Sequence, residues 1–212
     1  LTALQPDNQR LQLHLPEALL ATQDGAQASR ALRKALELDP QQGEARRALG
    51  MMALRDRRPA EALSTAREWQ KHDPKDAGGF ALEGDVEASR RNWVPAISAY
   101  QAALKLSDAT EAAMKLHAAY RAAGRYADAD RVAADWERRR AQDPAFQFYL
   151  GDVATNDKAY ARAEQHYRNV LRSQPGNALA MNNIAWLLLQ QSKPGALELA
   201  QQIGRASCRE RV

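Results

Sequence analysis

Alanines recur along the chain about every 34 residues, and apolar or small residues follow each of them at fixed distances. The repeated residues are Ala28, Ala62, Ala96, Ala129 and Ala163, at intervals of 34, 34, 33 and 34. Four residues later come Leu32, Ala66, Tyr100, Ala133 and Tyr167, and seven residues later come Ala35, Trp69, Ala103, Trp136 and Val170. Positions that repeat at four and seven share one face of a helix, so each alanine predicts an amphipathic helix.

A second apolar stripe precedes each of these helices and has the same helical spacing. It comprises Leu49 with Ala53, Leu116 with Tyr120, Leu150 with Ala154, and Ile184 with Leu188. Turn-forming segments separate the two stripes at residues 55–59, 89–93, 122–126 and 156–160, and the units close at Pro40, Pro74 and Pro175. Each unit therefore predicts a helix A, a tight turn, a helix B and a proline-marked break.

Packing between units must supply most of the stability, because isolated helices of about 12–15 residues are marginal in water. We expect Gly50, Gly84 and Gly151 where helix A presses against helix B of the same unit. Two prolines depart from the period. Pro144 comes three residues late, which predicts a longer helix B before it, and Pro16 predicts a shortened or kinked first helix A.

This unit resembles the tetratricopeptide repeat (TPR), a 34-residue helix–turn–helix with Leu-Gly in helix A and a small residue early in helix B. The resemblance implies an all-α fold, a right-handed TPR superhelical solenoid of antiparallel helix pairs. The TPR array covers residues 1–203, and residues 204–212 are expected to be a disordered or non-native tail. Within the array, residues 1–8 end a preceding unit, and the units span about 9–42, 43–76, 77–109, 110–143, 144–177 and, in part, 178–203.

Three segments are more particular than the general repeat. Residues 79–106, 114–125 and 177–191 are similar to the PEP-CTERM system TPR-repeat lipoproteins, a bacterial family encoded beside exosortase and exopolysaccharide genes. This resemblance implies a longer protein in the bacterial cell envelope, either periplasmic or anchored to the outer membrane. It carries over no catalytic residue, and the residues themselves leave a cytoplasmic location open.

Composition and charge narrow the classes of partner. The chain has 212 residues, 45% of them hydrophobic, and a net charge of +4 from 30 basic and 26 acidic residues. The basic residues alternate with acids at helical spacing, a pattern typical of a solvated surface, so we expect no nucleic-acid partner. The longest apolar run, Ile184–Leu189, is too short to insert into a membrane.

Residues with catalytic or metal-binding chemistry do not converge in the sequence. The four histidines are separated by at least 45 residues, and the single cysteine, Cys208, permits neither an internal disulfide nor a cysteine-based zinc site. No nucleophile elbow or glycine-rich phosphate loop is present. We therefore expect no enzyme activity, cofactor or metal.

A binding surface is better supported. In stacked TPR units, positions 2, 5, 9 and 12 of helix A face the concave groove, and counting from Gly43, Ala77, Thr110, Pro144 and Ala178 gives the candidate lining. It consists of Arg47, Met51, Leu54, Asp85, Met114, Arg121, Phe148, Asp152, Asn182 and Trp186. Exposed methionine and aromatic residues suit a protein or peptide partner. Alternatively, Met51, Met114 and Trp186 cover seams between repeats.

The sequence thus predicts a non-enzymatic scaffold that binds protein partners on its concave face, in an exopolysaccharide or PEP-CTERM system by resemblance. The lysine–asparagine pair with which some TPR domains grip a chaperone carboxylate is missing. Two alternatives stay open. One is a regulatory region of a larger enzyme, such as a glycosyltransferase. The other is a solenoid that binds anionic polymers through arginines in 55–58, 90–91 and 138–140.

Overall fold

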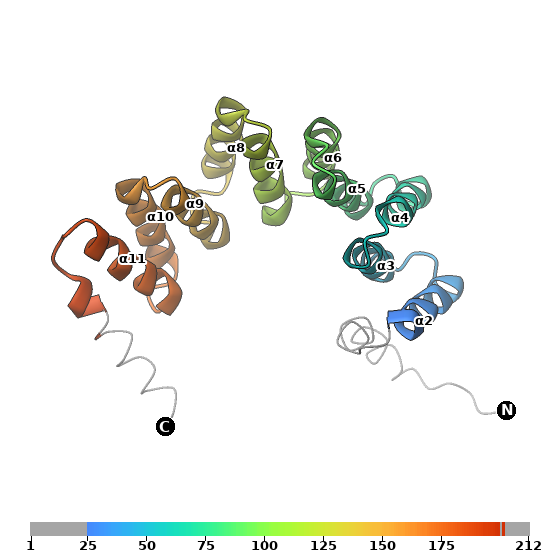
Figure 1. Cartoon of the computed structure of the whole chain (residues 1–212), viewed down its shortest axis with the longest axis horizontal. Helices are drawn as coiled ribbons and strands as arrows, with labels where there is room; N and C mark the ends of the chain where they lie inside the picture. The colour runs from blue at the N-terminus through green and yellow to red at the C-terminus, as the bar shows by residue number, and fades with distance from the viewer. Residues whose placement is uncertain (1–24, 200, 202–212) are drawn as a thin grey trace, which may run out of the picture. The chain divides into compact units, whose positions relative to one another are not determined.

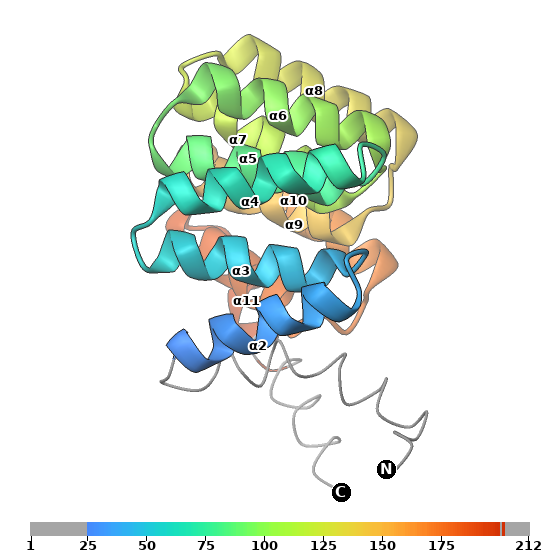
Figure 2. The same ribbon diagram turned by 90° about the vertical axis from the view of Figure 1, so that its right-hand side faces the viewer.

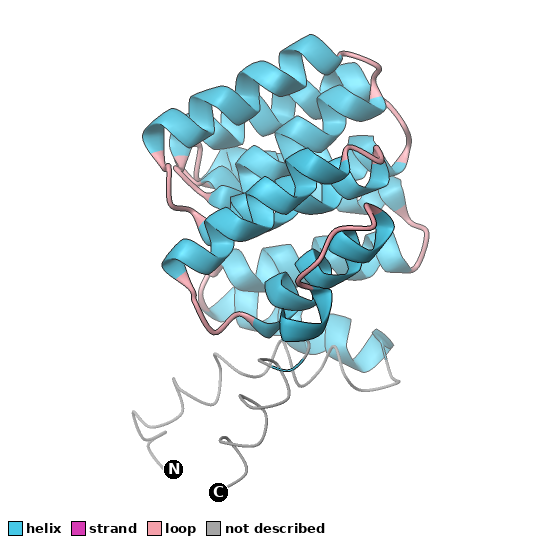
Figure 3. Cartoon of the chain, turned by 90° about the vertical axis from the view of Figure 1, so that its left-hand side faces the viewer, coloured by secondary structure: helices cyan, strands magenta, loops and turns pink. Residues whose placement is uncertain are grey.

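The computed structural model describes residues 25–199 and 201, and all regular structure in this part of the chain is α-helical (Figure 3). The all-α prediction is therefore confirmed. Residues 1–24, with the predicted kink at Pro16, and the predicted tail at 204–212 lie outside the described residues. The helices are α2 Gly25–Leu38, α3 Gly43–Arg55, α4 Pro59–His72, α5 Ala77–Ser89, α6 Trp93–Leu106, α7 Thr110–Ala122, α8 Tyr126–Arg139, α9 Pro144–Asn156, α10 Tyr160–Ser173 and α11 Ala178–Gln190 (Figure 1).

Two compact units make up the chain, an N-terminal unit that ends at Asp130 and a C-terminal unit that begins at Arg131. In the N-terminal unit, each helix from α2 to α7 contacts the next, and α3 also contacts α5. Figure 2 shows α2, α3 and α4 lying one above another. In the C-terminal unit, α9 contacts α10 and α10 contacts α11. Short turns make successive helices antiparallel, as the repeat predicts.

The periodic alanines form the centre of these contacts. Ala28, Ala62, Ala96 and Ala163 have no exposed surface, and Ala129 is 1% exposed. Tyr167 lies in the same core cluster as Ala163, and Trp136, Tyr167 and Phe146 are also almost fully buried. A small residue at this position lets two helices approach, and the aromatic residues fill the remaining space.

The glycines of helix A pack as expected in two units and differently in a third. A Cβ added at Gly84 would lie 2.4 Å from Cε1 of Tyr100, and one at Gly151 would lie 2.6 Å from Cε1 of Tyr167, both on helix B of the same unit. For Gly50 the prediction is wrong, because its nearest neighbour is Leu82 of the next helix A, at 2.4 Å. The position that holds a tyrosine in the other two units holds alanine here, so Leu82 takes the space.

The turn from helix A to helix B contains at least one residue with positive φ in every unit described. The first such residue in each turn is Arg57 (φ 58°), Arg91 (61°), Gly124 (72°), Lys158 (58°) and Ser192 (51°), and the last turn contains a second, Gly195 (103°). Only one of the five first residues is a glycine, although glycine adopts positive φ at the lowest cost.

Two tryptophans tie a helix B to the start of the following helix A. The indole Nε1–H of Trp69 donates to Oδ2 of Asp76 at 3.1 Å, and that of Trp136 donates to Oδ2 of Asp143 at 2.9 Å. Both aspartates also cap the next helix by accepting backbone N–H bonds. The same side chain thus ends one repeat and begins the next.

The longer helix B predicted before Pro144 is wrong. Helix α8 has 14 residues, as do α4, α6 and α10. Pro144 is the first residue of α9, where its fixed φ and missing N–H suit a helix start. The proline therefore begins a repeat here and does not close one.

Candidate binding site

The ninth residue of helix A is an aspartate in two repeats, and each aspartate is bound to a tyrosine of its own helix B. The Tyr100 hydroxyl donates to Oδ1 of Asp85 at 2.8 Å, and the Tyr167 hydroxyl donates to Oδ1 of Asp152 at 2.6 Å. The glycine before each aspartate makes this possible, because the tyrosine ring lies directly against it. Asp85 and Asp152 were both predicted to face the groove.

In the N-terminal unit a lysine completes this arrangement. Nζ of Lys115, on α7, donates to Oδ2 of Asp85 at 2.8 Å and lies 2.9 Å from Glu111 Oε1. The side chains of Asp85 and Lys115 are 18% and 29% exposed, so the pair is mostly shielded from water. Burial lowers the pKa of Lys115, but the two carboxylates outweigh it and raise that pKa above its ordinary value. The Asp85 charge is therefore neutralised within the protein.

In the C-terminal unit the corresponding place holds a neutral residue. Lys115 is the sixth residue of α7, and the sixth residue of α11 is Asn183. The described residues contain no cation bound to Asp152. Burial and the Asp152 carboxylate together raise the pKa of Tyr167 to about 12, against smaller opposing hydrogen bonds from Thr155 and Asn183. Tyr167 therefore stays a hydroxyl that donates to Asp152.

A cavity of about 930 Å³ opens beside Asp152. Its lining includes Asp152, Asn182, Asn183, Trp186, Leu189 and Leu197. Trp186 is 44% exposed, and its ring meets Tyr160 edge-on with the centroids 5.8 Å apart. The cavity thus combines an apolar wall, amide groups that can both donate and accept hydrogen bonds, and one carboxylate.

The structure brings three of the predicted groove residues together here: Asp152, Asn182 and Trp186. Phe148 is not among the lining residues, but its ring packs against Tyr167, which is, with the centroids 5.2 Å apart. Asn183 and Tyr167 also line the cavity but were not predicted as site residues. Their signal was the alignment of the two repeats, in which Tyr167 matches Tyr100 and Asn183 matches Lys115.

The predicted groove residues of the N-terminal unit have varied surroundings. Arg47 is bound to Glu44 on the same helix, and the Arg121 guanidinium lies 5.4 Å from the Tyr126 ring centroid. Met51 is 45% exposed, whereas Met114 is half-buried. Arg47 also lies near enough to Glu111 to help Lys115 lower the pKa of that carboxyl, so the charged groups of this groove are already paired with one another.

The tetratricopeptide repeat model matches residues 17–77, 118–178 and 159–211, together more than half of the chain. The chain belongs to the tetratricopeptide repeat family. Members of this family are generally non-catalytic scaffolds, and TPR domains bind protein or peptide partners. Among curated proteins, none matches the chain.

Solved TPR structures share this fold at low sequence identity. A thermophilic TPR protein of Thermus thermophilus is 17% identical with a TM-score of 0.64, covering 84% of this chain and 97% of its own. Pseudomonas aeruginosa PilF is 18% identical with a TM-score of 0.62, covering 96% and 90%. YrrB, described as a TPR protein with an unusual peptide-binding site, is 16% identical with a TM-score of 0.50, covering 84% and 93%.

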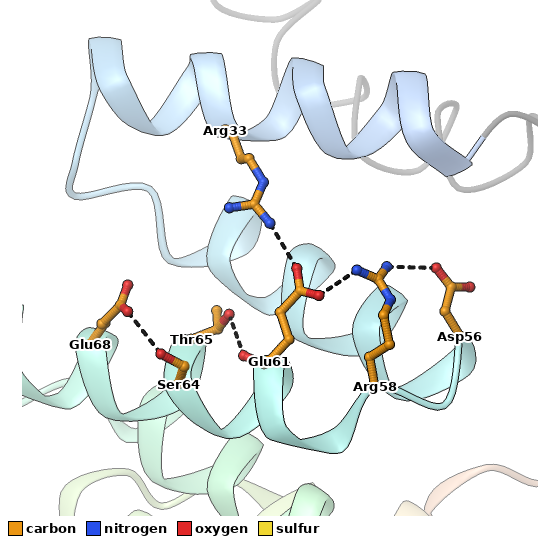
Figure 4. A network of polar contacts seen from close by, with 7 residues as sticks. All are labelled: Arg33, Asp56, Arg58, Glu61, Ser64, Thr65 and Glu68. Carbon is orange, nitrogen blue, oxygen red and sulfur yellow. Dashed lines mark hydrogen bonds and ion pairs between the residues drawn. The ribbon is translucent and has the colours of Figure 1, made fainter.

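Arginines in the three basic clusters of this TPR chain have acidic neighbours within the chain. Figure 4 shows Arg58 between Asp56, at 2.9 Å, and Glu61, while Arg33 of α2 reaches Glu61 at 2.7 Å. The other two clusters contain the pairs Arg90–Glu87 and Arg138–Asp135. A polyanion would have to compete with these carboxylates.

In residues 25–199 and 201, no three His, Cys, Asp or Glu side chains are grouped so as to hold a metal ion. The helices described there are also too short or too polar to cross a bilayer.

Proposed function

We propose that the protein is a non-enzymatic scaffold that binds a peptide segment of a partner protein in the cavity beside Trp186. The observation that carries this is the meeting of a half-exposed tryptophan, two asparagines and a carboxylate around a 930 Å³ space. Buried aromatic anchors supply most of the affinity of such interfaces. Asparagine amides can pair with both the N–H and the C=O of an extended peptide.

The test is peptide capture by the full chain carrying Trp186→Ala. Arrayed octapeptides of random sequence serve as probes, and binding is quantified for every spot. We expect the affinity for captured peptides to fall at least about tenfold, the usual effect of removing an aromatic hot spot. Leu106→Ala is the matched control, because Leu106 is 42% exposed but lies on α6. Equal capture by both variants would remove the cavity as the binding site.

The biological setting is a second part of the proposal. The similarity of residues 79–106, 114–125 and 177–191 to PEP-CTERM system TPR lipoproteins supports a role in bacterial exopolysaccharide production or exosortase-linked sorting. It also supports a location in the cell envelope. Fractionation of the native bacterium tests this, and recovery of the protein solely with cytoplasmic markers would contradict it.

A further inference from the structure

Two described repeats of this chain contain the same aspartate–tyrosine pair, and in only one of them is a cation of the chain bound to the aspartate. In the N-terminal unit, the Lys115 ammonium lies 2.8 Å from Asp85 Oδ2, while Tyr100 occupies Oδ1. When the tyrosine is bound to one carboxylate oxygen of the aspartate, the other oxygen can therefore bind an alkylammonium ion. In this unit that ion is the lysine side chain of the next helix A.

The C-terminal unit retains the pair and lacks the lysine. Tyr167 occupies Oδ1 of Asp152 at 2.6 Å, and Asn183 stands in the repeat position of Lys115. Asparagine is shorter than lysine and carries no charge. Asp152 itself is exposed, and the cavity lies next to it.

The described side chains that line this cavity carry charge of one sign. Among the described residues that line it, Asp152 is the only ionisable side chain other than Tyr167, whose raised pKa keeps it neutral. The nearby Lys193 is directed to Glu164, at 3.3 Å, and lines a different depression. A ligand that brings a positive charge would thus meet an uncompensated carboxylate.

We infer that the cavity selects a lysine or arginine side chain of the bound peptide, whose cationic group contacts Asp152 as Lys115 contacts Asp85. This inference rests on the proposed function and specifies the partner's chemistry. Trp186 lies on the same wall, where its ring can cover the aliphatic stem of such a side chain and attract its charge. The cationic side chain of the partner thus takes the place that Lys115 occupies in the N-terminal unit.

Acetylated and amidated octapeptide pools test this, with one central position fixed as Lys, Arg, Leu or Glu and the others randomised. The unsubstituted chain should capture the Lys and Arg pools about fivefold better than the Glu pool, as expected for a partly exposed ion pair. Asp152→Asn retains the acceptor for Tyr167 but removes the charge, and should abolish this preference. Asn183→Lys places a lysine where the N-terminal unit has one, and should abolish it too.

Asp85→Asn is the matched control, because Lys115 already occupies that carboxylate, and it should leave the preference unchanged. A preference for Lys and Arg that survives in Asp152→Asn would overturn the inference. If all four pools were captured equally and Trp186→Ala still reduced their capture, the inference about charge would be overturned and the proposed function would stand. Loss of any dependence on Trp186 would overturn the proposed function as well.

Discussion

Asp85 in the N-terminal unit and Asp152 in the C-terminal unit occupy the same place in their repeats, and each accepts a hydrogen bond from a helix B tyrosine. They differ in what stands at the sixth residue of the following helix A. Lys115 neutralises Asp85 from within, whereas Asn183 leaves Asp152 beside an open cavity. One polar pair can therefore stabilise one repeat and form a binding surface in another, according to a single neighbouring residue.

The largest expected loss of stability concerns the glycine that precedes the aspartate in each of the two repeats. Gly151→Leu would force a side chain into the Tyr167 ring, which already lies 2.6 Å from an added Cβ. We expect a loss of about 1–3 kcal/mol in the free energy of unfolding, measured by urea denaturation, because overpacked cores must distort. Gly84→Leu should cost a similar amount against Tyr100.

Gly176→Ala is the control for this pair, because a Cβ there would meet no atom within 4 Å. It should leave the unfolding midpoint nearly unchanged. If Gly151→Leu were as harmless as Gly176→Ala, the close contact between helix A and its tyrosine would not hold the repeat together.

A smaller effect should separate the two aspartates. Lys115→Met leaves the shielded Asp85 carboxylate without its cation, and we expect it to lower the free energy of unfolding by about 1–2 kcal/mol. Asn183→Met removes no cation from the neighbourhood of Asp152 and should lower the free energy of unfolding by less than half as much. Chemical denaturation of both variants measures this difference. Equal losses would show that the two sites are not electrostatically distinct.

The smallest effect is expected in the turns, where both units again offer a comparison. Arg91→Gly and Lys158→Gly each place glycine at a position with positive φ, where a side chain causes backbone strain. Each should raise the free energy of unfolding by about 0.5–1 kcal/mol. The reverse change, Gly124→Ala, should lower it by a similar amount, because its φ of 72° disfavours a side chain although space is available. Thermal unfolding measures all three, and destabilisation by both glycine variants would contradict the explanation.

Much of the fold followed from spacing alone. The positions counted as first in each helix A, from Gly43 to Ala178, are the residues at which α3, α5, α7, α9 and α11 begin. The errors arose where a residue type has two structural uses. Pro144 can close one helix or open the next, and the Asp143 cap decides for the second. Gly50 can admit a partner from helix B or from the next helix A.

Less of the candidate site could be predicted from the sequence. Counting the groove positions of stacked TPR units along helix A selected Asp152, Asn182 and Trp186, which the resemblance to the family implied. It also selected Phe148, which does not line the cavity but packs against Tyr167, a residue that does. Asn183 was missed, since its importance depends on which carboxylate lies opposite on a different helix.

The helical repeat, its phase and its small residues follow from the order of residues along the chain, because local propensity and a 34-residue period act there. Which charges are neutralised depends on the packing of the folded protein. The distance from Lys115 to Asp85, and the cavity beside Asp152, depend on how separate helices pack. Electrostatic pairing falls off with distance in space, and residues 30 positions apart in the sequence can still be in contact.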